Sequence, residues 1–326
     1  MFNPLSSVEP WSLVAEGYTK STKQFLEGYA LKAIELMGLK SDCVVLDVAA
    51  GPGTLSIPLA KNVKEVYAID FSIPMLEQLK NGIKEANVQN VFTYVMDGQK
   101  LEFESDRFDA AFSMFGLMFF PDKLLGLKEI HRVLKPKGKI AVSSWAPISN
   151  STLMQCLFGA LRKANPEIPS PQTNVESFEN PDFIRDHFRS SGFKEIEIVS
   201  FSNSIKVENI QGFLNMMIEG SAPIQLMKSK LEESVWKEKK KLCLIIFRNN
   251  LLYFQFHFLR KRSLRLLKNL SILLFLVLSI SDSTRYYNRI VLLFQKNFFR
   301  NVIVPTNIRA NIFYDVIVPT FLRILV

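Results

Sequence analysis

VVLDVAAGPGTLSIPLA, residues 44–60, is the stretch that decides the fold. It starts as an apolar strand that ends at Asp47, and a Gly-Pro-Gly turn at 51–53 then opens a helix predicted over 53–61. Because glycine has no Cβ, this turn lets the backbone approach a ligand closely, and the helix N-terminus adds N–H donors. Glycine turns are also common punctuation, so a structural turn without a ligand stays open for this stretch taken alone.

Short β-rich runs alternate with helical patterns on either side of this stretch. Strands are predicted at 43–50, 64–70, 91–97, 108–115 and 139–145, and further helices at 73–87 and 122–135. The runs CVVLDVAA, VYAID and IAVSSW are nearly continuously apolar, which is typical of strands buried on both faces of a parallel sheet. The sequence therefore predicts an α/β fold in which ligands lie beyond the carboxyl ends of the strands.

The remaining chain divides into a cap, a substrate-side part and an extension. Residues 1–39 form an N-terminal helical cap on the core at 40–147, and residues 148–241 complete a domain that spans 1–241. In that last part we expect helices at 151–164, 180–190, 208–219 and 224–241, and a turn and strand at 191–201. Residues 242–326 are a poorly specified hydrophobic tail without glycine or glutamate.

Charge is distributed unevenly along the chain, whose net charge is +9. Residues 1–241 hold 28 Lys and Arg against 29 Asp and Glu, whereas residues 242–326 hold 12 basic residues and only two acidic ones. A near-neutral body gives no electrostatic footprint for a phosphate backbone, so we expect no nucleic-acid partner. Oligomeric state has no signature in the sequence.

The three cysteines, Cys43, Cys156 and Cys243, lie too far apart in sequence for a zinc-ligand pair or a redox CxxC motif. The N-terminus has no basic region followed by an apolar run, which argues against a secretory signal. We therefore expect a cytoplasmic protein without a metal site.

Asp70 strengthens the case for a nucleoside cofactor. It ends the next predicted strand 19 residues after Gly51, where an acidic side chain accepts hydrogen bonds from ribose hydroxyls. A dinucleotide fingerprint requires a third glycine, but Ser56 stands at that position. The pyrophosphate cradle of a dinucleotide site is therefore incomplete.

Four blocks resemble, in order and spacing, the class I S-adenosylmethionine-dependent methyltransferases, most of all their small-molecule, quinone-biosynthesis branch. The blocks are VLDVAAGPG, AIDFSIPML, VMDGQKLEFESDRFDAAFSMFGLMFF and KEIHRVLKPKGKIAVSSW. The resemblance is clear over about 40–147. It implies a Rossmann-like, doubly wound, mostly parallel sheet of about seven strands with helices on both faces. It also implies S-adenosyl-L-methionine as cofactor and a small-molecule methyl acceptor.

The resemblance also implies a role for individual residues. The methionyl part of the cofactor would be cupped by Asp47, Ala49, Gly51 and Gly53, with Ala49 standing where the family often has glycine. Asp70 would bind the ribose. The adenine would be flanked by Phe71 and Met75 and faced by Asp97, Gly98 and Gln99, and Ser113 would lie beside the transferred methyl. Asp97 followed by Gly98 could instead be an ordinary turn.

Catalytic residues stay unknown from the sequence. Methyl transfer from a sulfonium relies mainly on positioning. If a base assists, the candidates are Tyr18 and His187, for which surface or packing roles are the competing interpretation. Trp11, Tyr18, Trp145 and Phe158 favour an apolar or aromatic acceptor, although such residues at helical spacing are also typical of a core.

Two other function classes and two interpretations of the tail remain. The protein could be a catalytically inactive binding protein with a methyltransferase fold, or an NAD-dependent oxidoreductase. In the tail, the basic residues at 260–262 before an apolar run to Ile280 suggest a membrane anchor, but the run is shorter than the ~20 residues of a bilayer span. Alternatively, 242–326 is a divergent extension that replaces the family's last strand, with 242–247 as the candidate for that strand.

Overall fold

The computed structural model describes residues 3–166, 178–207, 209–250 and 314–325. The chain divides into two units, of which the first comprises Met1–Phe247 together with Asp315–Val326 and the second Arg248–Tyr314. The membrane anchor considered from the sequence, at 260–280, lies outside the described residues. Among the described residues, no helix is both long and apolar enough to cross a membrane.

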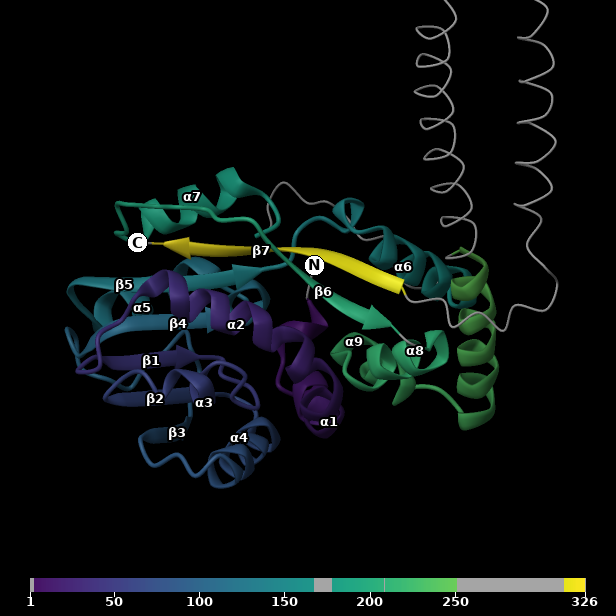
Figure 1. The fold of residues 1–326 in the computed structure, drawn as a ribbon, viewed down its shortest axis with the longest axis horizontal. Helices are drawn as coiled ribbons and strands as arrows, with labels where there is room; N and C mark the ends of the chain where they lie inside the picture. The colour runs from purple at the N-terminus through teal and green to yellow at the C-terminus, as the bar shows by residue number, and fades with distance from the viewer. Residues whose placement is uncertain (1–2, 167–177, 208, 251–313, 326) are drawn as a thin grey trace, which may run out of the picture. The chain divides into compact units, whose positions relative to one another are not determined.

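One sheet of seven strands forms the centre of the first unit, in the order β3-β2-β1-β4-β5-β7-β6 (Figure 1). The five strands from β3 to β5 are parallel to one another, and β7 pairs antiparallel with β5. The strand bounds are β1 Val44–Val48, β2 Glu65–Asp70, β3 Val91–Val95, β4 Phe108–Met114, β5 Leu134–Ser144, β6 Phe201–Val207 and β7 Tyr314–Leu325. The predicted doubly wound, mostly parallel sheet is confirmed.

Helices cover both faces of this sheet, because alternate residues of each buried strand point to opposite sides. Among the described residues, the labelled helices of the first unit are α1 Glu9–Gly17, α2 Lys23–Met37, α3 Ser56–Leu59, α4 Ile73–Glu85, α5 Lys123–Val133, α6 Thr152–Ala164, α7 Pro181–Ser190, α8 Ile210–Glu219 and α9 Ala222–Lys228. A further helix runs over 233–250. Val45 faces a core cluster with α2, α3 and α4, whereas Leu46 faces a second cluster with α5 and α7. The predicted two-sided burial of the sheet is therefore confirmed.

The N-terminal cap consists of α1 and α2 joined by a π-helical turn, Tyr18–Thr22. This turn lies against the α8–α9 connection, where the Thr22 hydroxyl donates to the Gly220 carbonyl (3.2 Å). Gly17 makes the close approach to the same connection, because a Cβ built there would lie 2.2 Å from the Glu219 carbonyl oxygen. The cap therefore packs directly against the backbone of the α8–α9 connection, and the glycine at position 17 makes this close approach possible.

Gly17→Ala is expected to destabilise the protein by about 1–3 kcal/mol, because the new methyl group overlaps backbone that cannot rotate away. The matched control is Gly212→Ala in α8, where the nearest atoms to a built Cβ lie 3.8 Å away. That change should be neutral or stabilising, by up to about 1 kcal/mol of helix propensity. Urea unfolding of both variants checks the prediction, and equal effects would contradict it.

Four elements differ from the sequence-based expectation. The helix predicted over 224–241 is divided into α9 and a second helix over 233–250. The helix predicted over 53–61 shrinks to α3, because the left-handed backbone of Gly51 and Gly53 keeps the preceding residues in a turn. The strand predicted within 191–201 lies at β6 instead, and Ile196 and Ile198 pack against the second core cluster without joining a strand.

The candidate strand at 242–247 is wrong, because these residues belong to a helix over 233–250. Its buried residues Trp236, Cys243 and Phe247 lie seven and four positions apart, which places them on one helical face. The strand beside β5 is instead β7, from the far end of the stretch that the sequence assigned to an extension.

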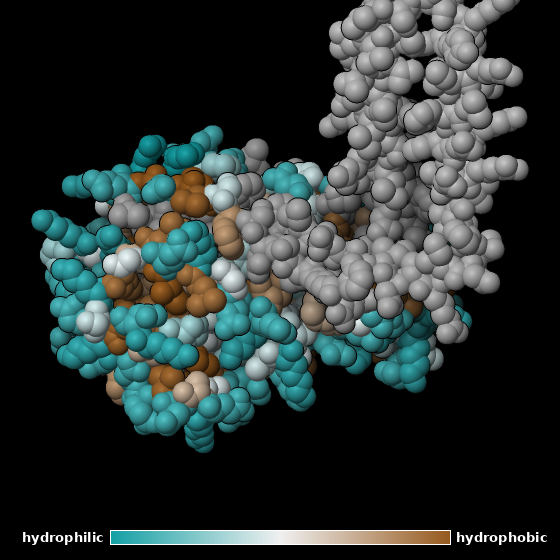
Figure 2. Space-filling model, viewed as in Figure 1, coloured by the Kyte–Doolittle hydropathy of each residue, from teal (hydrophilic) through white to brown (hydrophobic). Residues whose placement is uncertain are grey.

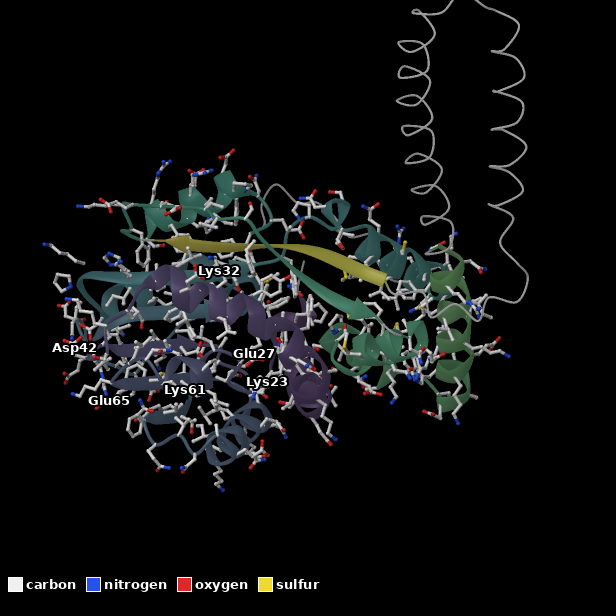
Figure 3. All side chains as sticks on the ribbon, viewed as in Figure 1. Lys23, Glu27, Lys32, Asp42, Lys61 and Glu65 are labelled. Atoms are coloured by element: carbon white, nitrogen blue, oxygen red, sulfur yellow. The ribbon has the colours of Figure 1, made fainter. Side chains whose placement is uncertain are left out.

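Figure 2 shows hydrophilic side chains over much of the visible face of the sheet-containing unit, with hydrophobic patches between them. Charged side chains of both signs alternate there. Lys23, Lys32 and Lys61 lie among Glu27, Asp42 and Glu65 (Figure 3). The visible face therefore carries mixed charge.

Candidate functional site

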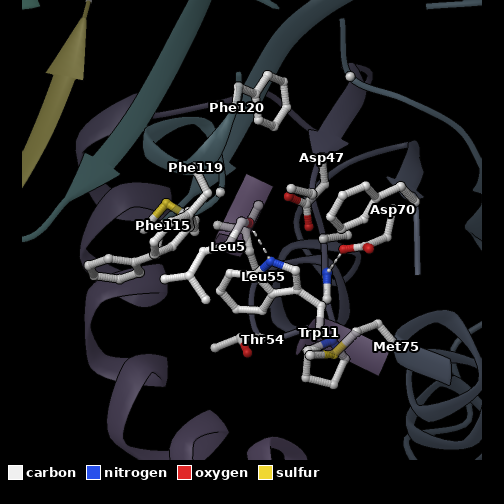
Figure 4. A pocket seen from close by; sticks show the side chains of 18 of the residues that line it. Leu5, Trp11, Asp47, Thr54, Leu55, Asp70, Met75, Phe115, Phe119 and Phe120 are labelled. Carbon is white, nitrogen blue, oxygen red and sulfur yellow. Dashed lines mark hydrogen bonds between the residues drawn. The ribbon is translucent and has the colours of Figure 1, made fainter. Parts of the chain in front are cut away.

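A pocket opens beyond the carboxyl ends of β1, β2 and β4, where the sequence analysis placed the ligand (Figure 4). It encloses about 1160 Å³, part of which is open to solvent. Eleven of the site and acceptor residues named from the sequence line it: Trp11, Tyr18, Asp47, Ala49, Gly51, Asp70, Phe71, Met75, Asp97, Gly98 and Gln99. Lining residues from the ends of four strands, β1 to β4, thus converge as the parallel topology requires.

The turn after β1 forms the floor of the pocket through left-handed backbone. Ala49, Gly51 and Gly53 have φ angles of 58°, 53° and 80°. Glycine adopts this region freely, whereas alanine does so at a cost of roughly 1 kcal/mol, so the departure at Ala49 is a strained one. The methyl group of Ala49 also accounts for the glycine at position 116, after β4. A Cβ built on Gly116 would lie 2.4 Å from the Ala49 Cβ.

This close approach predicts a compensating pair. Gly116→Ala alone is expected to destabilise the protein by about 1–3 kcal/mol through overpacking. Adding Ala49→Gly removes the colliding methyl group and the strained alanine, so the double variant should recover most of that loss. A double-mutant cycle by urea unfolding measures the coupling, and additive effects of the two changes would contradict the prediction.

Asp47 is the buried carboxylate of the site. Its side chain is 1% exposed, and Oδ2 accepts a 2.5 Å hydrogen bond from the Ser56 hydroxyl. Its other oxygen, Oδ1, has no hydrogen-bond partner among the residues that the structure describes. Burial raises the pKa of Asp47 to about 7, the Ser56 hydrogen bond opposes this rise, and the Asp70 charge adds to it. The pocket therefore contains an acceptor oxygen that a bound cation or donor would satisfy.

Asp70, at the end of β2, ties two loops together. One oxygen accepts from the Gly51 N–H (2.8 Å), and the other accepts from the Ser72 N–H (2.9 Å). Burial raises the pKa of Asp70 to about 6, against the effect of these backbone donors. Each carboxylate oxygen has more than one lone pair, so both retain capacity for ligand hydroxyls.

Asp97 and Gln99 line the rim after β3. The Asp97 carboxylate accepts from the Gln99 N–H (2.8 Å), which is a turn contact, and the Gln99 side-chain oxygen accepts from the Asp122 N–H (2.9 Å). Gly98 lies beneath the Phe120 ring, which a built Cβ would approach to 2.4 Å. Asp97 both closes this turn and lines the pocket. The two roles expected for it from the sequence, turn residue and ligand contact, are therefore compatible.

The cap provides much of the apolar wall of the pocket. Most of these cap residues were not identified from the sequence. Leu5 and Ser6, from a short 3-10 turn (Pro4–Ser6), line the pocket together with Trp11. The Trp11 indole donates to the Leu5 carbonyl (2.9 Å), and the Ser6 hydroxyl donates to the Phe119 carbonyl (2.7 Å). A three-residue turn carries no periodic signal, and its role depends on contacts more than 100 residues apart. Further lining residues that the sequence did not assign are Leu26, Ala30, Thr54, Leu55, Met96 and Pro121.

Five residues that the sequence placed at the cofactor or acceptor site do not line the pocket: Gly53, Ser113, His187, Trp145 and Phe158. Gly53 packs against α4, where a built Cβ would lie 2.2 Å from the Leu79 side chain. The Ser113 hydroxyl is buried and accepts from the Leu117 N–H (3.1 Å), which shapes the turn after β4. His187 lies on α7, where Nδ1 donates to the Phe183 carbonyl (2.9 Å) and the two rings pack 3.9 Å apart.

Tyr18 does line the pocket, but its environment suits a hydrogen-bond donor better than a base. Burial and the nearby Asp70 charge raise the pKa of Tyr18 above its ordinary value of 10. The phenol therefore stays protonated at neutral pH. Among the described residues, no cluster of His, Cys, Asp and Glu is placed to hold a metal ion.

The donor set of this pocket fits S-adenosylmethionine. Among its lining residues are three carboxylates, Asp47, Asp70 and Asp97, and no Lys, Arg or His. The cofactor carries an ammonium and a sulfonium, and the unpartnered Asp47 oxygen is an acceptor that such a cation would satisfy. A pyrophosphate would find no cationic side chain among the same lining residues.

Comparisons with known proteins agree with this assignment. A methyltransferase domain family matches residues 45–138. The chain is 30% identical over 188 residues to a demethylmenaquinone methyltransferase of Staphylococcus saprophyticus, covering 53% of this chain and 80% of that protein. It is 32% identical over 183 residues to the Staphylococcus aureus (strain JH9) protein of the same name, covering 52% and 75%.

A solved structure of a putative methyltransferase from Bacillus halodurans is also similar, with a TM-score of 0.46 and 17% identity over 64% of this chain and 87% of that one. The sequence matches extend over three quarters or more of the two Staphylococcus relatives. The chain therefore belongs to the class I S-adenosylmethionine-dependent methyltransferases, enzymes that transfer the methyl group of this cofactor to an acceptor.

Proposed function

We propose that the acceptor is a small, uncharged and largely apolar molecule with a planar ring. The observation that carries this proposal is the composition of the pocket wall. The described lining residues include carboxylates and no cationic side chain, and Leu5, Trp11, Phe115 and Phe119 supply apolar surface. An anionic acceptor would meet repulsion there without a compensating partner. A planar apolar ring would bury its faces against aromatic side chains.

We also propose roles for the residues on the cofactor side, which the same geometry supports. We propose that the free oxygen of Asp47 receives the methionyl ammonium, directly or through water, and that Asp70 accepts from the ribose hydroxyls. Phe71 and Met75 flank the adenine, and the Asp97–Gln99 turn faces its amino group. Gly53 and Ser113 support this site from behind, by shaping the turns that line it.

Catalysis in this proposal relies on positioning. The cofactor supplies a methyl group on an activated sulfur leaving group. The chain's own residues bring the acceptor atom in line with that methyl group and exclude water, which is worth several orders of magnitude in rate. Because Tyr18 keeps its proton, it orients the acceptor or the cofactor as a hydrogen-bond donor, and His187 takes no part.

The relatives add a concrete acceptor class. Two of them are named demethylmenaquinone methyltransferases, so we propose a reduced quinone ring or a similar hydroquinone as the acceptor. The test uses the full chain with methyl-labelled S-adenosylmethionine and reduced 1,4-naphthoquinone. A sulfonated analogue of the same ring serves as the anionic control. Label on the neutral ring alone, when the whole reaction is resolved by chromatography, supports the proposal. Equal or preferred labelling of the anionic ring would contradict it.

We further propose that the catalytic domain comprises 1–247, beyond the boundary at 241 expected from the sequence, completed by β7, and that the protein works in the cytoplasm. Any membrane association would come from 242–326, which holds the basic excess. Fractionation of cells that express the full chain tests this location. Recovery of the protein in the membrane fraction after a salt wash would contradict a cytoplasmic location.

A further inference from the structure

Phe115, the residue directly after β4, has an unusual backbone conformation. Its φ angle is 58°, in the left-handed region that favours glycine. A bulky side chain there is uncommon and costs free energy, since Cβ approaches the following carbonyl oxygen. Such residues persist where the surroundings impose the conformation, and they cluster at ligand sites. The strained backbone of Phe115 must therefore be imposed by its surroundings.

The surroundings fix this residue from three sides. Its N–H donates to the buried hydroxyl of Ser143 on β5 (2.9 Å). Its ring lies against two others, with centroids 4.4 Å from Trp145 and 5.7 Å from Tyr29 on α2. The next residue, Gly116, lies so close to Ala49 that only glycine fits. The ring of Phe115 is therefore held in one place.

That place is the wall of the pocket away from the carboxylates. Figure 4 shows Phe115 and Phe119 on one side and Asp70 on the other. Leu26 and Ala30 of α2 and Met114 of β4 line the pocket as well, and Leu26 shares a cluster with Phe115. The Phe115 ring thus belongs to an apolar surface that none of the proposed cofactor contacts uses.

We propose that Phe115 is a specificity-determining residue, whose strained backbone presents its ring as the surface on which the acceptor's planar ring packs. This inference rests on the proposed function, because it requires an apolar ring as acceptor. A ring held rigidly between Trp145 and Tyr29 needs no ordering when the acceptor binds, which favours affinity. The cofactor contacts at Asp47 and Asp70 are independent of it.

The rival explanation is that Phe115 only fills the core. Phe112 is the matched control, since it lies on β4 three residues before Phe115, is 0% exposed and does not line the pocket, whereas Phe115 is 6% exposed and lines it. Loss of a ring at either position destabilises the fold. Only loss at Phe115 should change the affinity for an aromatic ligand.

The experiment measures binding of 2,3-dimethyl-1,4-naphthoquinone to the full chain saturated with S-adenosylhomocysteine, by quenching of tryptophan fluorescence. Positions 2 and 3 of the quinone ring both carry methyl groups in this probe, so it neither adds to thiols nor accepts a methyl group there. Trp11 lines the pocket and Trp145 contacts the Phe115 ring, so both are placed to report the binding. The variants are Phe115→Leu, Phe115→Ala and Phe112→Leu, each also titrated with S-adenosylhomocysteine alone.

We expect Phe115→Ala to weaken probe binding ~10-fold or more and Phe115→Leu to weaken it less, in line with the loss of an aromatic contact. S-adenosylhomocysteine affinity should stay within about 2-fold, and Phe112→Leu should lower the melting temperature without changing probe affinity. Unchanged probe affinity in the Phe115 variants would overturn the inference and leave the proposed acceptor class intact. Equal loss in Phe112→Leu, or a parallel loss of S-adenosylhomocysteine affinity, would also overturn it. Failure of the unchanged protein to bind the probe while it binds S-adenosylhomocysteine would refute the acceptor class, and the inference with it.

Discussion

Replacing Asp70 with alanine is expected to weaken the binding of S-adenosylhomocysteine by ~10-fold or more, the equivalent of ~1.4 kcal/mol. The carboxylate holds Gly51 and Ser72 through their N–H groups and has lone pairs left for two ribose hydroxyls. Its removal therefore costs ligand contacts and loosens the turn that forms the floor. Isothermal calorimetry measures the loss.

Two further variants separate these effects. Asp70→Asn keeps the size and one acceptor oxygen, so it should fall between alanine and the unchanged protein. Asp186→Ala removes an exposed carboxylate from α7, where the side chain is 74% exposed, and should leave the affinity within about 2-fold. If Asp186→Ala weakened binding as much as Asp70→Ala, net charge rather than a ribose contact would explain the result.

The second large effect that we expect is a pH dependence of stability and of cofactor affinity, caused by the buried carboxyl of Asp47. Its folded-state pKa of about 7 lies above the ordinary value of 3.8. Between these two values the folded state keeps a proton that the unfolded state has lost, so the cofactor-free protein loses stability as pH rises through this window. Binding of the cofactor's cation requires the charged carboxylate. Affinity for S-adenosylmethionine should therefore fall as pH decreases below about 7, by up to ~10-fold per unit.

Asp47→Asn should reverse both properties. At pH 8 the ligand-free variant should be more stable than the unchanged protein, because a buried, partly unsatisfied charge costs roughly 1–3 kcal/mol. Its affinity for S-adenosylmethionine should be lower and should lack the step near pH 7. Thermal unfolding and calorimetry at pH 6, 7 and 8 measure these quantities, with Asp186→Asn as the exposed control. A variant that is less stable at pH 8 and keeps the pH step would contradict the account.

The parallel core was predictable because its signals are local. Apolar runs such as 44–48 are typical of strands buried on both faces, and the spacing from Gly51 to Asp70 spans one β-α-β unit. Since parallel strands end at the same edge, the position of Asp47 and Asp70 beside one pocket followed from the strand order. These predictions needed no knowledge of distant contacts.

The last strand could not be predicted, for a physical reason. A short apolar run such as 242–247 fits a strand and a buried helix equally well, and here packing of Trp236, Cys243 and Phe247 selects the helix. The strand beside β5 comes from 314–325 instead, more than 100 residues after β6. Such a pairing is set by tertiary contacts, which leave no local pattern.

The two catalytic candidates show the same limit. Tyr18 and His187 were equivalent from the sequence, as titratable side chains near the expected site. The fold places Tyr18 in the pocket wall and His187 against Phe183 on α7. The raised pKa of Tyr18 then comes from burial and from Asp70, neither of which a sequence pattern reports.

The central claim is that the carboxylate side of the pocket holds a nucleoside sulfonium cofactor and not a dinucleotide. Calorimetric titration of the full chain with S-adenosylhomocysteine and, separately, with NAD at pH 8 tests it most directly. We predict saturable one-to-one binding of S-adenosylhomocysteine and no measurable heat with NAD. Tight binding of NAD, or no binding of S-adenosylhomocysteine by a sample that unfolds cooperatively, would contradict the claim.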